Sequence, residues 1–276
     1  MVHELLKKPL GEITYITKLA GFEYTKHFDY EVGGEIIALR SMNIKNGKLD
    51  LAEVHTIPKS VSDALPRSQL KLNDVVLGYV GSKLGNLAKI EHDNKFHLAP
   101  NVAVIRPSEK IDSDYLLQYM QSSYFQSRLW AFASSTGQPA LSMTNIRKLP
   151  ILLLNIDEQC KIAQILSIWD KAISTTESLI NNSKQQKKAL MQQLLTSKKR
   201  LLDESGKPFE GEWKKTKLSN IADIIMGSSP KSSSYNKISE GLPLIQGNAD
   251  IKNRKTAPRI YTSEVTKQCR VDDILL

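Results

Sequence analysis

The sequence predicts an α+β fold: a mixed α/β globular region, then a long helix, then an incomplete second region resembling the first. Three observations predict this fold. Residues 1–154 alternate short apolar runs with helical patterns, and residues 157–200 repeat apolar residues at helical spacing without an internal proline or glycine. The sequence after the long helix returns to patterns of the first region. We therefore expect three parts, with bounds 1–154, 155–205 and 206–276.

The first region contains several short β-type runs separated by glycine and asparagine turn signals, such as Gly33-Gly34 and Asn46-Gly47. Residues 114–133 repeat apolar side chains with the period of a helix, and the residues before them offer N-caps. A short helical turn at 143–148 precedes the closing strand. The expected strands are 13–17, 35–41, 69–80, 87–90, 101–106 and 149–154, and the N-cap candidates are Asp112, Ser113 and Asp114.

The long helix carries a narrow apolar stripe whose residues recur in alternating steps of four and three. Such spacing predicts a coiled-coil seam, interrupted here at Thr176, Ser183 and Lys187. A helix of about 65 Å with a narrow stripe cannot bury that stripe in a small globule, so it needs another helix alongside. An ordinary helical hairpin or spacer is an open alternative. The predicted helix-pairing residues are Ile162, Leu166, Trp169, Ile173, Ile180, Leu190 and Leu194.

An internal repeat links the first region to the last. In the first region the third matched stretch is followed by a glycine-rich loop, a helix and a closing strand, whereas in the last region the sequence stops at this point. We therefore expect the second region to be incomplete. The matched stretches are 10–13 with 218–221, 37–44 with 243–251, and 72–77 with 271–276.

Composition excludes several protein classes. A hydrophobic content of 41% is enough for a packed core. No apolar run reaches membrane-spanning length, and Lys7, Lys8 and Pro9 break any signal-peptide pattern. Cys160 and Cys269 lie far apart and suggest neither a disulfide framework nor a zinc site. We therefore expect a reduced, cytoplasmic protein that does not associate with membranes.

The net charge of +9 favours a polyanionic partner such as nucleic acid. Part of the positive charge is clustered on the long helix, at Lys184, Lys187 and Lys188 and again at residues 198–200. A solvated helix face is the alternative interpretation of both clusters.

The sequence shows no catalytic constellation. Residues 227–233 superficially suggest a phosphate-binding loop, but they lack the second glycine before the lysine, and Pro230 interrupts them. No nucleophile has an evident base. The histidines lack metal-ligand spacing, so we expect no metal, no cofactor and no catalytic residue. These histidines are His3, His27, His55, His92 and His97.

Polar residues suited to reading DNA are gathered on three separate loops. Arginine pairs with guanine and asparagine or glutamine with adenine, whereas lysine reaches phosphate. For any single residue, an exposed polar loop position is the alternative. Together they predict a recognition face made of Arg40, Asn43, Lys45, Ser82, Lys83, Asn86, Gln138, Ser142, Thr144 and Asn145.

Several motifs resemble one known family. Residues 136–142, with Ile146 and 149–151, are similar to its domain-closing segment. Residues 157–159 are similar to the start of its spacer helix. Weaker likenesses are 80–82, 101–107, 227–230, 234–236 and 246–247, together with Asp170 on the helix. On these motifs the chain resembles the specificity subunits of type I restriction–modification enzymes.

The resemblance implies two target-recognition domains, each reading one half of a bipartite site in double-stranded DNA. It also implies two long antiparallel helices that set the half-site spacing and dock methyltransferase (modification) subunits. Methylation and cleavage would then belong to these subunits and to a restriction/translocase subunit, which carry the S-adenosylmethionine and ATP sites.

From the sequence as it stands, we expect a departure from the family pattern: a second recognition domain that is cut short and no second long helix. We therefore expect a homodimer through the spacer helix. The alternatives are a coiled-coil scaffold protein without a DNA role and a free-standing DNA methyltransferase.

Overall fold

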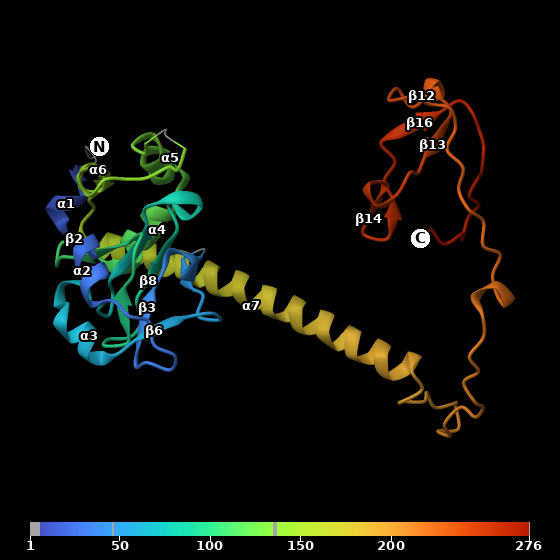
Figure 1. The fold of residues 1–276 in the computed structure, drawn as a ribbon, viewed down its shortest axis with the longest axis horizontal. Coiled ribbons are helices and arrows are strands. Elements are labelled where there is room, and N and C mark those ends of the chain that lie inside the picture. The colour runs from blue at the N-terminus through green and yellow to red at the C-terminus, as the bar shows by residue number, and fades with distance from the viewer. Residues whose placement is uncertain (1–5, 46, 135–136, 276) are drawn as a thin grey trace. The chain divides into compact units, whose positions relative to one another are not determined.

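The computed structural model describes residues 6–45, 47–134 and 137–275, and it divides into two compact units, Met1–Lys188 (unit 1) and Ala189–Leu276 (unit 2) (Figure 1). Predictions that involve His3, Asn46, Thr136 or Leu276 lie outside the described residues.

The main sheet of unit 1 has four antiparallel strands in the order β2-β10-β7-β8. Its two faces pack into two different cores. In β10, Ala103 and Ile105 join one core, while Val102 and Val104 join the other. Because neither face is exposed, its central strands read as continuous apolar runs. The strands are β2 (Thr14–Lys18), β7 (Val75–Gly78), β8 (Leu87–Lys89) and β10 (Val102–Pro107).

Smaller strand pairs complete unit 1. A three-stranded sheet has the order β6-β3-β9, with β3 antiparallel to β6 and parallel to β9. Two further sheets have two strands each. One joins the start of the described chain to the predicted closing strand, and the other is a hairpin. The strands are β3 (Ile36–Leu39), β6 (His55–Ile57), β9 (Phe96–Leu98), β1 (Lys7–Pro9) with β11 (Pro150–Leu152), and β4 (Ile44–Lys45) with β5 (Lys48–Leu49).

The predicted helix at 114–133 is two helices, α4 (Ser113–Gln121) and α5 (Ser123–Ala131). Ser122 breaks it, with extended backbone and a hydroxyl that accepts a hydrogen bond from Phe125 N at 3.3 Å. Of the N-cap candidates, Asp112 is the cap, and its carboxylate accepts from two amides of the first turn. The other helices are α1 (Leu10–Ile13), α2 (Gly21–His27), α3 (Lys59–Ala64) and α6 (Met143–Lys148), with short 3₁₀ turns at Ser41–Asn43, Pro66–Ser68 and Gly81–Lys83.

The predicted long helix is α7 (Ile156–Leu195), about 60 Å long. It ends earlier than the predicted residue 200, and shortly beyond its last residue Ser197 adopts a left-handed backbone with φ of +59°. The structure buries Gln159 and Ala163 of this helix. The remainder is exposed or only partly covered within the described chain.

Unit 2 is built from short elements. Its three-stranded sheet has the order β12-β16-β13, and a separate hairpin pairs β14 with β15. The strands are β12 (Tyr235–Asn236), β13 (Leu242–Leu244), β14 (Ile251–Lys252), β15 (Lys255–Thr256) and β16 (Ile260–Thr262), and 3₁₀ turns lie at Leu218–Asn220, Ser232–Ser234 and Asn248–Asp250.

Unit 2 repeats part of the element order of unit 1. In both, a strand leads through a 3₁₀ turn into a tight hairpin, and a later strand then pairs antiparallel with the first. The same closing hydrogen bond recurs, from Asp50 N to Asn43 O at 2.8 Å and from Ala257 N to Asp250 O at 2.7 Å. The matched stretches 37–44 and 243–251 therefore share their local structure.

The third matched pair also repeats in detail. Asn73 and Asp272 both have left-handed backbones, with φ of +68° and +72°. The following aspartate caps the turn in each case: Lys71 N donates to Asp74 Oδ2 at 2.8 Å, and Arg270 N donates to Asp273 Oδ2 at 2.7 Å.

Candidate nucleic-acid interface

The three polar loops predicted to form a recognition face lie together in unit 1. We call them loop A (residues 40–45, after β3), loop B (residues 79–86, after β7) and loop C (residues 137–145). Asn86 Nδ2 of loop B donates to Ile44 O of loop A at 2.9 Å. Loops A and B therefore lie next to each other in this structure.

Backbone pairing joins loop B to loop C. Val80 and Ala140 form an antiparallel bridge, and Gly81 N donates to Pro139 O at 2.7 Å. Gly81 has a φ of +73°, and a Cβ there would lie 2.9 Å from Gln138 Nε2. Glycine at this position therefore allows the left-handed backbone of the turn, and its lack of a side chain leaves room for Gln138.

Two of the predicted contact residues use their side chains in hydrogen bonds that hold the loops in shape. Asn43 is 2% exposed, and its carboxamide accepts from Arg40 N and donates to Asp50 O and Glu53 O. The side chain of Asn86 is used in the link to Ile44. Both amides therefore shape loops A and B in this structure.

Three further predicted residues also have intramolecular partners. Lys45 pairs with Asp50 and, with Ala52 N, lowers the pKa of that carboxyl. The Ser142 hydroxyl caps α6 by accepting from Asn145 N at 3.0 Å. Asn145 Nδ2 in turn donates to Phe132 O at 3.1 Å, which attaches loop C to the end of α5.

The remaining five predicted residues have side chains that form no hydrogen bond or ion pair with another described residue. Ser82, Gln138 and Thr144 are exposed, while Arg40 and Lys83 are half-buried. Arg40 Nε is buried without a hydrogen-bond partner among these residues. Side chains without an internal partner can bond a ligand that reaches them, which makes these five the strongest candidates for contact with DNA. DNA contact by all ten residues stays a prediction.

Sequence reasoning missed the polar contacts that attach α7 to the loops. Lys48 follows loop A in the β4–β5 hairpin, and its Nζ donates to Ser174 Oγ on α7 at 3.0 Å. The two residues are separated by 126 positions. No spacing rule connects residues so far apart, so only the folded chain reveals this pair.

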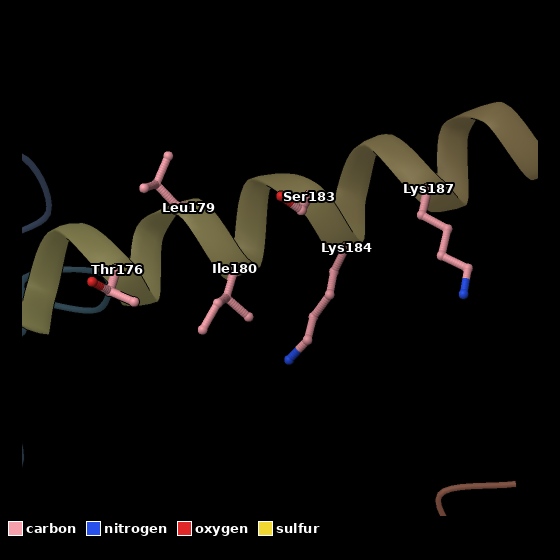
Figure 2. A pocket seen from close by; sticks show the side chains of 6 residues that line it. All are labelled: Thr176, Leu179, Ile180, Ser183, Lys184 and Lys187. Atoms are coloured by element: carbon pink, nitrogen blue, oxygen red, sulfur yellow. The ribbon is translucent and has the colours of Figure 1, made fainter.

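The predicted helix-pairing stripe is largely exposed on α7. Trp169 is 65% exposed and Ile173 55%. Ile162 instead packs partly against a core of unit 1, and Leu194 is half-buried. A shallow hollow further along the helix is lined only by side chains of α7 itself, including Ile180, Lys184 and Lys187, which point to one side (Figure 2). Helix pairing therefore stays a prediction.

A metal site and a membrane-spanning helix are two features that the sequence does not predict. Within residues 6–45, 47–134 and 137–275, no three histidine, cysteine or acidic residues gather as a metal site. No helix in those ranges is long and apolar enough to span a membrane.

Comparisons with known proteins give the family. Residues 7–185 match the family described as the type I restriction modification DNA specificity domain. A Methanocaldococcus jannaschii protein named as the MjaX type I restriction enzyme specificity subunit is 29% identical over 249 residues, which cover 86% of this chain and 58% of that protein. The Escherichia coli EcoBI specificity subunit is 25% identical over 155 residues, which cover 56% of this chain and 32% of that protein.

A solved structure agrees in fold. Its description is the complex assembly and conformational transition of the type I R-M system, and it aligns with a TM-score of 0.58 at 23% identity. The alignment covers 96% of this chain and 67% of the other, which confirms the predicted α+β fold with a long helix between two regions.

These likenesses give no support to a coiled-coil scaffold without a DNA role. The chain spans less than two thirds of the length of the curated relatives that it matches. Because the family match covers more than half of the sequence, this chain belongs to the type I restriction modification DNA specificity domain family.

Proposed function

We propose that this chain recognises a specific sequence in duplex DNA through loops A, B and C. The observation that carries the proposal is the meeting of the three loops, which leaves five polar side chains without partners among the described residues. A net charge of +9 supports attraction to phosphate.

We propose that the ten predicted residues have two roles: some contact DNA, and the others maintain the shape of the loops. Arg40 and Gln138 have side chains suited to bidentate base contacts, and Lys83 is suited to phosphate. The hydroxyls of Ser82 and Thr144 can serve either target. The residues that bond within the loops, Asn43, Lys45, Asn86, Ser142 and Asn145, would then hold the recognition geometry.

We further propose the domain roles implied by the family: 1–154 as a recognition domain, 155–205 as a spacer helix and 206–276 as part of a second recognition domain. The chain itself would catalyse nothing. Its partners would be methyltransferase subunits and a restriction/translocase subunit, which perform adenine methylation and cleavage. The local repeats shared by the two units support this division.

DNA binding tests the first proposal directly. Binding of the chain, alone and with its methyltransferase subunit, is measured by fluorescence anisotropy against duplexes at several salt concentrations. A steep loss of affinity with salt is expected, because phosphate contacts release counterions. Sequence-specific methylation should require both components. Methyl transfer by the chain alone, or salt-independent binding, would contradict the proposal.

We also propose that α7 pairs with α7 of a second copy. Leaving Trp169 and Ile173 in water forgoes about 1.5–3 kcal/mol for each side chain. An antiparallel pair has two-fold symmetry and would present two identical recognition domains, so its target would be palindromic.

Analytical ultracentrifugation tests the pairing. Ile173→Glu should convert the dimer into a monomer, whereas Glu177→Gln, an exposed substitution on the same helix, should leave the dimer intact. A wild-type monomer with and without the methyltransferase subunit, or a methylated site with two unrelated halves, would rule out self-pairing.

A further inference from the structure

One buried carboxamide fixes the start of α7 to the globular part of unit 1. Gln159 is 0% exposed. Its Oε1 accepts from Asp112 N at 2.9 Å, and its Nε2 donates to Lys110 O at 3.1 Å and to Leu154 O at 2.9 Å. Both hydrogens and the oxygen are therefore used, which favours a single orientation of the side chain.

Two more polar contacts hold the same face of the helix further along. Gln118 on α4 donates to Asp170 Oδ2, and Lys48 on the β4–β5 hairpin donates to Ser174 Oγ at 3.0 Å. With buried Ala163, the contacted positions are 159, 163, 170 and 174. Steps of four and seven keep these positions on one side of a helix.

The exposed part of the apolar stripe lies beside this contacted face, while Ile162 of the stripe packs partly against the core of unit 1. Trp169 and Ile173 directly precede the contacted residues Asp170 and Ser174, so each is turned by about 100° from the contacted residue that follows it. Holding one face against the domain therefore gives the stripe a defined direction.

The hairpin connects this attachment to the recognition loops. Its first strand continues loop A, and Ile44 O accepts the bond from Asn86 of loop B. At the hairpin turn, Gly47 has a φ of +80°, and a Cβ there would lie 2.4 Å from Gln121 Nε2 at the end of α4. The hairpin therefore fits closely against α4 and reaches α7 through Lys48.

We propose that the β4–β5 hairpin, α4 and Gln159 form a joint that fixes the direction of α7 relative to loops A, B and C. Lys48, Gln118 and Gln159 are its positioning residues. This inference rests on the proposed function. In that setting, the joint sets the distance along DNA between the half-site that unit 1 reads and the recognition domain and methyltransferase subunits that α7 positions.

Electron–electron resonance distances test the joint without DNA. Nitroxide labels are placed at Lys26→Cys and Gln185→Cys, both exposed in unit 1, in a chain with Cys160→Ser and Cys269→Ser. The labelled chain is diluted into an excess of unlabelled chain, so that only distances within one chain are measured, and the parent should then give one narrow distance distribution. Gln159→Ala should broaden it, and Lys48→Ala combined with Gln118→Ala should also broaden it by removing only the contacts nearer the surface.

The control is Lys161→Ala combined with Glu177→Ala, two exposed positions of α7 that leave these three contacts intact. The distance distribution of the control should equal that of the parent. A double variant Lys48→Ala/Gln118→Ala as narrow as the parent would overturn the joint even if Gln159→Ala failed to fold.

Spacer selectivity tests the functional consequence. The complex with its methyltransferase subunit is assayed on duplexes whose half-sites lie at the mapped spacing, or one base pair closer or farther apart. The Lys48→Ala/Gln118→Ala variant should discriminate among spacings about fivefold less, as expected from the loss of one or two hydrogen bonds, with unchanged half-site sequence. Unaltered spacer discrimination would overturn the role in spacing. A wild-type complex that ignored DNA sequence would instead contradict the proposed function, and the distance measurement would still decide the joint.

Discussion

Units 1 and 2 contain matched stretches that form similar local structure but differ sharply in burial. From Leu10 in unit 1 and from Leu218 in unit 2, apolar residues recur at the same spacing. In unit 1 they lie in the core, and in unit 2 they are exposed. The pairs are Leu10 (0% exposed) with Leu218 (53%), Ile13 (3%) with Ile221 (71%), and Ile16 (3%) with Ile224 (64%).

The difference comes from segments distant in sequence. In unit 1 these residues share a core with Ile105 of β10, Ile146 of α6 and Ile151 of β11. Among the described residues of unit 2, no element corresponds to β10, α6 or β11. Turns, caps and left-handed residues thus depend on nearby sequence, whereas burial depends on segments much farther along the chain.

Core truncation should give the largest contrast between the units. Leu10→Ala should lower the free energy of unfolding of unit 1 by about 3 kcal/mol, because it leaves a cavity at a fully buried site. Leu218→Ala should change stability by less than about 0.5 kcal/mol, as is usual for surface positions. Calorimetry of the full chain measures both effects. Equal losses of unfolding free energy in the two variants would contradict the difference in burial between Leu10 and Leu218.

The second-largest difference in stability between the units should come from a buried ion pair in unit 1. Asp74 is 1% exposed and accepts from Arg106 Nε and Nη2, both at 2.7 Å, whereas its counterpart Asp273 is exposed. Asp74→Asn should cost about 2–3 kcal/mol, less than a fully buried pair because the Arg106 side chain is 27% exposed.

Asp273→Asn is the matched control for this ion pair. It should leave the urea midpoint unchanged. A similar shift in both variants would show that the ion pair does not distinguish the units.

The recognition loops should give a contrast in DNA binding. Unit 1 joins loops A, B and C, while the described part of unit 2 has counterparts only of loop A and its hairpin. Gln138→Ala should reduce discrimination between target and altered sites by about 1–3 kcal/mol through a lost base contact. Lys83→Ala should weaken binding to all sequences nearly equally, because phosphate contacts carry no sequence information.

Titrations with cognate and altered duplexes measure this contrast. Lys252→Ala, in the unit 2 hairpin, is the control and should leave discrimination by unit 1 unchanged. If Gln138→Ala left discrimination intact, loop C would be misassigned.

The smallest predicted effect is a loss of stability in two matched turns, and it should be equal in units 1 and 2. Asn73→Ala and Asp272→Ala place alanine in left-handed backbone and should each destabilise their turn by about 1 kcal/mol. Hydrogen exchange of the Asp74 and Asp273 amides, which donate to Lys71 O and Arg270 O, measures the change. A difference of tenfold or more between the two accelerations would show that these turns depend on their tertiary surroundings.

Sequence periodicity predicted the elements well where the signal was local. The short helix at 143–148 and the cap at Asp112 follow from cap chemistry and apolar spacing. The break at Ser122 was missed because apolar spacing continues across it and one serine supplies the local alternative.

The candidate site was predictable as a set of loops but not in the use of each side chain. Asn43 and Gln138 are equally polar in sequence, yet one is buried in its own loop and the other is exposed. The sequence signal for base contact is residue type alone. Which side chain has a partner depends on contacts across the fold, such as that between Asn86 and Ile44.

The joining of loops B and C by main-chain atoms has a consequence for engineering. The bonds at Gly81 and Pro139, and between Leu141 N and Tyr79 O, do not depend on side-chain identity at neighbouring positions. Ser82, Lys83, Gln138 and Thr144 can therefore be randomised together in a library while the glycine and the bridging backbone are kept. Selection from such a library would separate binding preference from folding, because the scaffold that presents these positions stays constant across its members.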